Sequence, residues 1–275
     1  MNKLVLPLNL IMGLVMSFTV SAHQPAKGVV LKGQLTQGSM VIGKTHQGAK
    51  VLLNQKPLKV SANGDFVFGF GRDDKLQHEL KVISQSGEVE IKPLTLSKRK
   101  YKVEDIKGID KKYVSPPKDV LARIIANGKQ VAKARAVDTE RLDFLSDIKQ
   151  PVQGRISGVY GSQRVLNGVP KRPHFGLDIA APTGTKVLAP LQGIVVLTHD
   201  DMYYTGGTLI IEHGFGITST FIHLSKILVK EGDVIKQGDV IAQVGATGRV
   251  TGPHLDWRMN WYKVRLDPQL LLETE

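Results

Sequence analysis

Short apolar runs, broken by glycine, asparagine and proline, fill the sequence from residue 28 onward and leave little room for long helices. In the first third these runs include Val29–Leu31, Met40–Ile42 and Phe66–Phe70. Asn63-Gly64, just before the last run, is a strong signal for a tight hairpin turn. Runs of this length separated by turn residues are typical of strands, so we predict a small β-sandwich over residues 26–97.

The first 22 residues have a different pattern, with a basic start followed by an apolar stretch from Leu4 to Val20. Val20-Ser21-Ala22 offers the small residues of a cleavage site, which predicts a secretory signal peptide over residues 1–22. The alternative is an uncleaved membrane anchor, because the stretch is close to the shortest length that spans a bilayer. No later segment is apolar enough to span. We therefore expect an exported protein of the periplasm or cell envelope, whose mature chain begins near His23.

The chain carries a net charge of +12 and contains no cysteine. This charge fits nucleic acid, anionic lipid or an anionic wall polymer as a neighbour, or simply a basic soluble surface. Export removes nucleic acid from this set. An exported chain without cysteine has no disulfides, so its stability depends on packed cores and a metal site would have to use His, Asp or Glu.

Residues 98–150 form a predicted basic and helical connector. The segment Leu96–Lys102 is rich in lysine and arginine, and Ser115-Pro116-Pro117 breaks regular structure. The basic run could hold a wall polymer, or it could be an ordinary solvated face. From Lys118 to about Leu145 the apolar residues recur near helical spacing, which predicts a helix.

From residue 151 to 270 the chain is again rich in glycine and short apolar runs, with no strong helical period. Gly232-Asp233 and Gly238-Asp239 lie in two nearly duplicate segments and look like tight turns between strands. We predict an antiparallel β domain here. The fold class is therefore mainly β, with a β-sandwich, a helical connector and a C-terminal antiparallel domain.

Three short segments of this last domain concentrate residues that can bind metal or move protons. They contain His174 with Asp178, His223 alone, and His254 with Asp256. Side chains two or four apart on a strand share a face, so two neighbouring strands would bring these groups to one patch. His174, Asp178 and one residue of the third segment could hold zinc in a three-ligand site, with the other histidines beside it for acid–base work. Hydrogen-bonded surface pairs have the same spacing and stay open as an alternative.

The motifs around these residues carry a family resemblance. They are Gly-Val-Tyr160-Gly-Ser-Gln, Pro-His174-Phe-Gly-Leu-Asp178-Ile-Ala-Ala-Pro-Thr-Gly, Phe-Ile-His223-Leu-Ser, and Gly-Pro-His254-Leu-Asp256-Trp. Together, in this order, they resemble the lysostaphin/LytM-type zinc metallopeptidases over nearly all of residues 151–270.

This resemblance implies a compact antiparallel β fold and a zinc endopeptidase that cuts peptide bonds in peptidoglycan. It implies that His174 and Asp178 bind zinc and that His223 and His254 are catalytic. Asp256 stands where the family has a third histidine ligand, so the implied site has one histidine and two aspartates. A carboxylate adds negative charge and would make the zinc a weaker Lewis acid.

Two other functions stay open. Asp256 would also fit a wall-binding or regulatory module that has lost the metal and activates another hydrolase through envelope protein contacts. A carbohydrate-active enzyme would need paired acidic residues, for which Asp200-Asp201 in a predicted loop is weak support.

The remaining histidines and tryptophans have simpler interpretations. His46 and His78 are isolated in the first domain and are predicted to lie on the surface. His199 and His213 fall outside the matched positions, and His213 is predicted to be a structural hydrogen-bonding residue. Trp257 and Trp261 could line a groove or pack in the core.

Overall fold

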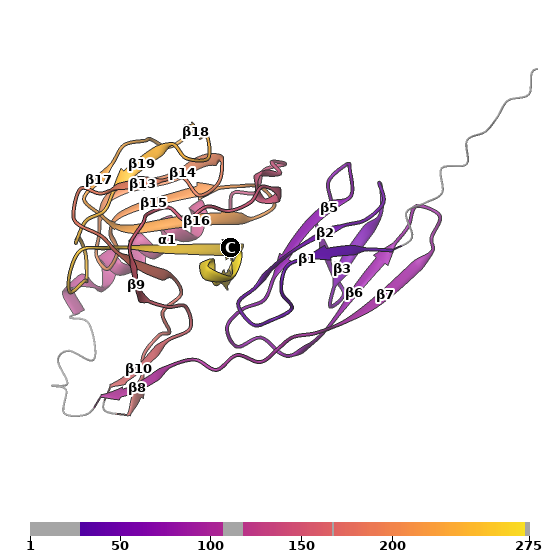
Figure 1. Ribbon diagram of the computed structural model, residues 1–275, viewed down its shortest axis with the longest axis horizontal. Helices are drawn as coiled ribbons and strands as arrows, with labels where there is room; N and C mark the ends of the chain where they lie inside the picture. The colour runs from indigo at the N-terminus through magenta and orange to yellow at the C-terminus, as the bar shows by residue number, and fades with distance from the viewer. Residues whose placement is uncertain (1–27, 107–117, 167, 273–275) are drawn as a thin grey trace, which may run out of the picture.

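The computed structural model describes residues 28–106, 118–166 and 168–272. It consists of two β lobes, an N-terminal lobe at the right of Figure 1 and a larger C-terminal lobe at the left. The predicted signal peptide lies outside the described residues. None of the helices in the described part of the chain is long and apolar enough to cross a membrane.

The N-terminal lobe is built from two small antiparallel sheets. Strands β1, β2 and β5 form one sheet, and β4, β3, β6 and β7 form the other, each in that spatial order. The bounds are β1 Val30–Lys32, β2 Met40–Lys44, β3 Lys50–Leu53, β4 Lys56–Leu58, β5 Asp65–Gly69, β6 Gln77–Ile83 and β7 Val89–Thr95. The predicted mainly-β fold is confirmed, while the limits 26–97, 98–150 and 151–270 stay predictions of domain organisation.

The two sheets share one apolar core. Strand β6 alternates exposed and inward positions, so that Leu80 and Val82 face inward and meet Phe66 and Phe68 from β5. His78 occupies an inward position of the same strand and is 7% exposed. Its ring nitrogens bond Asn54 and the Lys75 carbonyl, so the prediction of a surface histidine was wrong for His78.

An eight-stranded antiparallel sheet organises the C-terminal lobe. Its order is β18-β14-β15-β16-β20-β12-β9, with β21 paired to β20. The bounds are β9 Arg155–Gly158, β12 Leu177–Ala180, β14 Gly193–Met202, β15 Gly206–Glu212, β16 Ile217–Leu224, β18 Val234–Ile235, β20 His254–Trp261 and β21 Val264–Leu266. A smaller sheet is formed by β13 Lys186–Leu188, β19 Val240–Gln243 and β17 Lys226–Ile227.

The two faces of the large sheet differ in chemistry because strand residues alternate. On β20, Leu255, Trp257 and Met259 are fully buried in the main core of the lobe. The intervening residues of β20, namely His254, Asp256, Arg258 and Asn260, lie on the opposite face. We call this opposite face of the sheet the polar face, and it carries the candidate site.

Helix α1 (Leu121–Ala134) covers another part of the polar face and is visible beneath the sheet in Figure 1. Ala134 packs with Leu197 of β14 and Ile210 of β15. The predicted helix to about Leu145 was too long, since α1 ends at Ala134 and a short 3-10 turn, η3 (Asp143–Leu145), follows separately. The chain between them is fixed by tertiary contacts, including a bond from the Thr139 hydroxyl to Glu212.

The connector also contributes strands. β8 (Val103–Ile106) pairs in parallel with β10 (Gln163–Leu166), and β10 pairs with β11 (Val169–Pro170). This small sheet lies at the lower left of Figure 1, away from the N-terminal lobe. β8 and β10, which are far apart in sequence, are therefore paired shortly before His174 in the chain.

The two lobes pack against each other through apolar and charged contacts. Met40 and Val67 of the N-terminal lobe join the core of the C-terminal lobe, and Trp261 contacts the cores of both. Arg99 forms an ion pair with Asp267 at 2.7 Å, and the Asp267 side chain is 2% exposed. Asp267 also accepts a bond from the Gln269 amide at the start of η4 (Pro268–Leu271).

The substitution Asp267→Ala should lower the free energy of unfolding by about 2–4 kcal/mol, because it leaves Arg99 without its buried partner and removes a helix cap. Urea unfolding of the purified protein measures this. The matched control is Asp147→Ala, which removes an exposed pair with Lys32 between the same lobes and should change stability by less than about 0.5 kcal/mol. Equal effects of the two variants would contradict the assignment.

Candidate metal centre and active site

Strand pairing brings two carboxylates together at the centre of the polar face. β12 and β20 run antiparallel, with Asp178 directly opposite Asp256 and Ala180 opposite His254. Residues opposite each other on neighbouring strands have side chains on the same face. The predicted juxtaposition of these two segments is therefore present in the fold.

His174 reaches the same place from the segment before β12. Its backbone is fixed by two hydrogen bonds, one from its amide to the Ser162 carbonyl and one from the Gly161 amide to its carbonyl. Three potential ligand atoms, one from each of His174, Asp178 and Asp256, lie within 4.8 Å of one another. His174 is thus held by the loop that precedes β10, and it does not lie on a strand as the spacing argument assumed.

The polar atoms of this cluster fit a metal ion. His174 Nε2 and Asp178 Oδ1 are buried and lack a hydrogen-bond partner, although they lie 3.2 Å apart. The distance between His174 Nε2 and Asp178 Oδ1 is short enough for an ion pair, but the orientation of the two groups does not meet the criteria for a hydrogen bond. Two ligand atoms of one tetrahedral zinc ion are on the order of 3.3 Å apart. Two orphaned atoms at this separation suit a shared cation better than a direct bond.

Two glycines make the close approach of these groups possible. A Cβ atom on Gly176 would lie 2.1 Å from Asp256 Oδ1, and one on Gly158 would lie 2.2 Å from Asp178 Oδ2. Any side chain at either position would displace a carboxylate. The main chain therefore forms part of the wall of the cluster.

Asp256 has a second partner, Arg258, two residues further along β20. Arg258 Nε donates to Asp256 Oδ1 at 2.9 Å and its terminal nitrogen to Oδ2 at 2.5 Å. Both oxygens of Asp256 are thus engaged by a guanidinium in a bidentate pair. Asp256 thus bonds Arg258 and at the same time lies beside His174 and Asp178.

His223 and His254 lie side by side at the edge of this cluster, with ring centroids 4.9 Å apart. His223 Nδ1 lies 2.8 Å from the Thr247 carbonyl and His254 Nδ1 lies 2.9 Å from the Gly252 carbonyl. A carbonyl only accepts, so each Nδ1 carries the hydrogen and each neutral ring keeps a free lone pair on Nε2. His254 Nε2 is 3.9 Å from Asp178 Oδ1. Both rings can accept a proton next to the carboxylates.

The backbone at His223 is unusual, with a φ of 65° in the left-handed region. A residue other than glycine in this region carries strain, and such strain is concentrated at functional sites. The His223 amide donates to the Thr205 carbonyl, which helps to hold this conformation. His223 therefore lies where β16 departs from regular pairing.

Charges and burial give the groups of the cluster different pKa values. Burial acts to lower the pKa of His174, but Asp178 and Asp256 outweigh it and raise the pKa above its usual value. Burial lowers the pKa of His223. For Asp256, burial would raise the pKa, yet the Arg258 guanidinium lowers it to about 2. Asp256 is therefore ionised at neutral pH, and His223 is neutral.

The other residues considered from the sequence are placed elsewhere. His213 is fully buried and bonds the Gln192 carbonyl and the Ser219 hydroxyl, which agrees with a structural role. His199 accepts a bond from the Asp201 amide. Trp257 packs in the core, and Trp261 is partly buried between the lobes.

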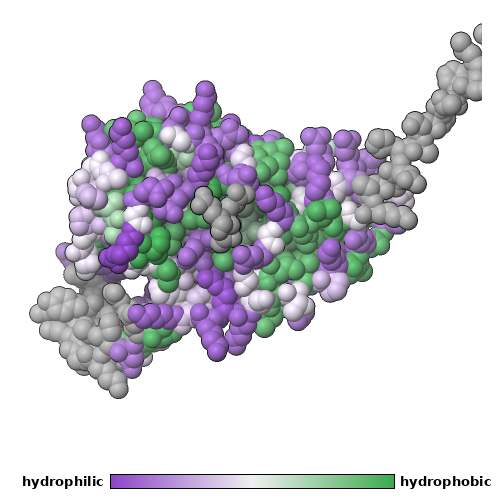
Figure 2. Space-filling view, viewed as in Figure 1, coloured by the Kyte–Doolittle hydropathy of each residue, from purple (hydrophilic) through white to green (hydrophobic). Residues whose placement is uncertain are grey.

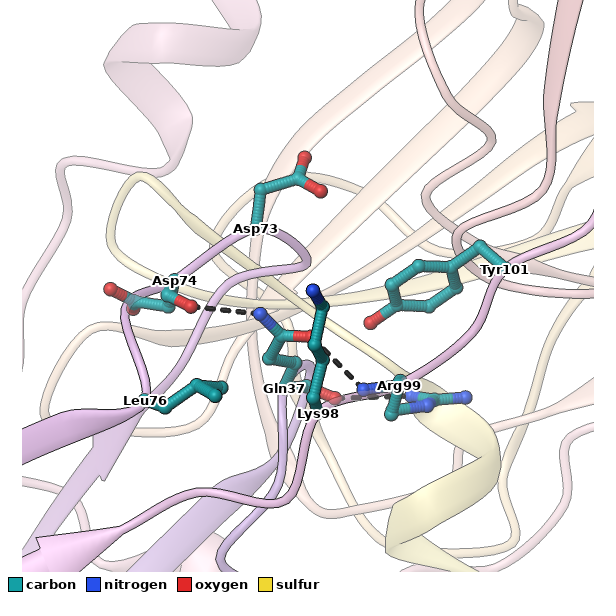
Figure 3. A pocket seen from close by; sticks show the side chains of 7 residues that line it. All are labelled: Gln37, Asp73, Asp74, Leu76, Lys98, Arg99 and Tyr101. Carbon is teal, nitrogen blue, oxygen red and sulfur yellow. Dashed lines mark hydrogen bonds between the residues drawn. The ribbon is translucent and has the colours of Figure 1, made fainter.

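Two cavities of the described residues lie apart from the cluster. One of about 360 Å³ is lined by Gln37, Asp73, Asp74, Leu76, Lys98, Arg99 and Tyr101 (Figure 3). Gln37 bonds the Asp74 carbonyl and the Arg99 amide there. A second, of about 570 Å³, lies at the junction of the lobes beside Trp261 and Tyr262. Neither contains a residue of the candidate site.

Three features of the site were missed in the sequence analysis. Gly158 and Gly176 act through the space that they leave, and a single sequence does not reveal which glycines are packed against carboxylates. Arg258 was not assigned a role in the metal centre. The alternation His254, Asp256, Arg258 on one strand was the available signal, because it places all three on one face.

Comparison with known proteins assigns this domain to a family. The sequence profile of peptidase family M23 matches residues 172–268, the stretch that contains every residue of the cluster. These residues form an M23 peptidase domain. The predicted lysostaphin/LytM-type resemblance is thereby confirmed.

Relatives of the M23 domain include two bacterial enzymes. It is similar to the peptidoglycan DD-endopeptidase ShyA of Vibrio cholerae, with 38% identity over 147 residues, or 50% of this chain and 34% of ShyA. It is also similar to the DD-carboxypeptidase/endopeptidase Mpg of Neisseria meningitidis, with 37% identity over 45% of this chain and 27% of Mpg. The chain thus matches about a third of the length of these relatives.

A solved structure matches more of the chain than the M23 domain alone. The crystal structure of a candidate M23 peptidase from Pseudomonas aeruginosa aligns with a TM-score of 0.67 and 27% sequence identity. The alignment covers 87% of this chain and 95% of that protein. The arrangement of an M23 domain with an additional β lobe is therefore shared with another protein.

In metal-free protein the pKa of His174 should lie above its ordinary value, and Asp178→Asn should lower it by removing the nearest negative charge. Because the folded-state pKa is raised, protonated His174 stabilises the fold below the unfolded pKa of about 6.5. This contribution disappears as the pH rises through the folded pKa. Histidine ring signals followed by NMR against pH report the titration.

His213 serves as the internal control for this titration. Burial lowers its pKa to about 4, so it should stay neutral from pH 5 upward in both proteins. An unchanged His174 titration in Asp178→Asn would show that the carboxylate does not set the His174 pKa.

Proposed function

We propose that this protein is a zinc-dependent endopeptidase that hydrolyses peptide bonds of peptidoglycan. The observation that carries the proposal is the convergence of His174, Asp178 and Asp256, with two of their ligand atoms buried and unpartnered. The substrate class rests on the similarity to ShyA and Mpg. ShyA is named a peptidoglycan DD-endopeptidase, and Mpg is named a DD-carboxypeptidase/endopeptidase. The basic charge of +12 suits an anionic wall.

In this proposal His174, Asp178 and Asp256 hold the zinc ion. Zinc bound there would supply a Lewis acid for the scissile carbonyl and make a water molecule more acidic. His223 is neutral and has a free Nε2, so it is suited to accept a proton from the attacking water. Once His254 has taken up a proton on Nε2, which lies beside Asp178, it can donate a hydrogen bond to the developing oxyanion or pass that proton to the leaving amine.

The positive charge of Arg258 offsets the negative charge that Asp256 adds to the metal centre. A second carboxylate charge beside the metal would weaken its Lewis acidity, whereas the bidentate pair returns one positive charge to the same carboxylate. The combination of Asp256 and Arg258 is then close in net charge to a neutral ligand. We propose that this pair stands in for a histidine.

Export belongs to the same proposal. Residues 1–22 would act as a signal peptide that delivers the protein to the periplasm or cell envelope, where peptidoglycan lies. The N-terminal lobe would dock the enzyme on the wall or on envelope protein partners.

The second candidate is a regulatory module that binds the wall without cleaving it. The observation that favours it is the engagement of both Asp256 oxygens by Arg258, which leaves fewer lone pairs for a metal. Such a module would bind peptidoglycan and stimulate another hydrolase. Metal content of the purified protein separates the two candidates.

His174→Ala and Asp178→Ala should each remove bound zinc and the release of peptides from purified peptidoglycan, because each loses a ligand. His223→Ala should keep zinc and reduce turnover by about 100-fold or more, as for loss of a general base. Metal analysis of the purified variants and a peptidoglycan release assay give the two readouts. Loss of zinc in His223→Ala would mean that its role is wrongly assigned.

The pair Asp256 and Arg258 can be tested by a double-mutant cycle with zinc affinity as the readout. Asp256→His alone should weaken zinc binding, because it leaves Arg258 as an unpaired cation near the metal. The double change Asp256→His with Arg258→Met should restore it. Additive effects of the two substitutions would show that the residues do not act as one unit.

A further inference from the structure

A group of arginines lies on the polar face beside the candidate metal centre. Arg258 lies on β20, directly opposite Thr220 of β16. Arg135 follows the last residue of α1 and donates to the Thr220 hydroxyl at 3.0 Å. Arg265 of β21 lies opposite Asn260 and donates to its side-chain oxygen at 3.2 Å. Three guanidinium groups, from the end of α1, from β20 and from β21, thus lie on the polar face, and that of Arg258 contacts Asp256.

The positive charge of this group is incompletely balanced. In the part of the chain that the structure describes, Arg258 has an ion-pair partner in Asp256, whereas none is found for Arg135 or Arg265. Arg135 Nε is buried without a hydrogen-bond partner. The carbonyls at the end of α1 offer only about half a negative charge.

The positive charges of these arginines repel one another, and together with burial they lower the pKa values of Arg135 and Arg265. Burial, followed by the charges of Arg265, Arg258 and Arg172, lowers the pKa of Arg135. Burial, Arg172 and Arg258 lower the pKa of Arg265 to about 10. Arg172 is exposed and lies over the Phe175 ring at 5.6 Å, at the entrance to β12. The guanidinium groups therefore repel one another, and an anion bound between them would reduce this repulsion.

We propose that Arg135, Arg258 and Arg265 form an anion-binding site that takes a carboxylate group of the substrate peptide. This proposal deepens the proposed function, on which it rests for the nature of the substrate. Arginine is suited to the task because its planar fork binds a carboxylate through parallel hydrogen bonds. The fork of Arg258 is already paired with Asp256, so Arg135 and Arg265 would supply the donors for the ligand. All three side chains are partly exposed, so a ligand can reach them.

The spacing along β20 fixes which carboxylate can bind. Alternate residues on a strand are about 6.7 Å apart, so Arg258 and Asn260 lie about 7 and 13 Å from Asp256 along the strand. An extended peptide advances at the same rate of about 3.3 Å per residue. A peptide that runs along β20 with a peptide bond at the metal centre would therefore place a carboxylate two to four residues away beside Arg258 and Asn260.

The test compares two probes, N-acetyl-D-alanyl-D-alanine and the same peptide with a C-terminal carboxamide. Calorimetric titration of the full-length protein should give tighter binding of the carboxylate by about tenfold or more, as for a charge-assisted hydrogen bond. Arg135→Gln and, independently, Arg265→Gln should abolish most of this preference. Arg135→Lys, which keeps the charge and loses the fork, should retain part of it.

The matched control is Arg123→Gln on the same helix, where Arg123 pairs with exposed Asp201 and should not affect the preference. Equal binding of both probes by the unsubstituted protein, or binding of neither at millimolar concentration, would overturn the anion site. So would a carboxylate preference that survives both glutamine variants.

The outcome for cleavage is separate from the outcome for binding. A protein that prefers the carboxylate but does not cleave peptidoglycan keeps the anion site and loses the proposed function. A protein that cleaves peptidoglycan but binds the two probes equally keeps the proposed function and loses the anion site.

Discussion

Two carboxylates facing each other on neighbouring strands are the constraint around which the polar face is built. Asp178 and Asp256 are cross-strand partners, and like charges in direct opposition destabilise a sheet. The fold compensates with His174 on one side and Arg258 on the other. Gly158 and Gly176 leave the space that the carboxylates occupy. The features of the cluster thus either balance the two negative charges or leave space for the two carboxylates.

The same sheet depends on its neighbours for rigidity. Its core face packs with the smaller sheet, its polar face is partly covered by α1, and its last strand meets the N-terminal lobe through Leu266 and Asp267. Leu266 lies so close to the N-terminal lobe that a Cβ on Gly69 would be 2.4 Å from it. On the face seen in Figure 2, hydrophobic side chains are interspersed with hydrophilic ones over both lobes. The N-terminal lobe is consequently packed against β21, the neighbour of the strand that carries Asp256.

Strand periodicity and turn chemistry were sufficient to predict the mainly-β fold and the meeting of Asp178 with Asp256. They were insufficient where tertiary contacts decide. His78 was expected on the surface, but Asn54 and the Lys75 carbonyl satisfy its ring in the core. Helical spacing continued past Ala134, yet Lys59 and Glu212 bind the following segment in a non-helical form. The arginine group draws on α1, β20 and β21, so no local pattern contains it.

Alternation along a single strand explains why ligand and recognition groups lie together. β20 places His254, Asp256, Arg258 and Asn260 on one face in sequence order, while the residues between them fill the core. A shift of one residue in register would bury the charges and expose Trp257, so the core fixes the order of the polar groups. In the proposed function, an extended peptide bound along β20 has the same rise per residue as the strand, so the order of groups along β20 would set the order of contacts along the substrate. Acid–base, ligand and arginine positions therefore cannot vary independently: the packing of Leu255, Trp257 and Met259 sets them all at once.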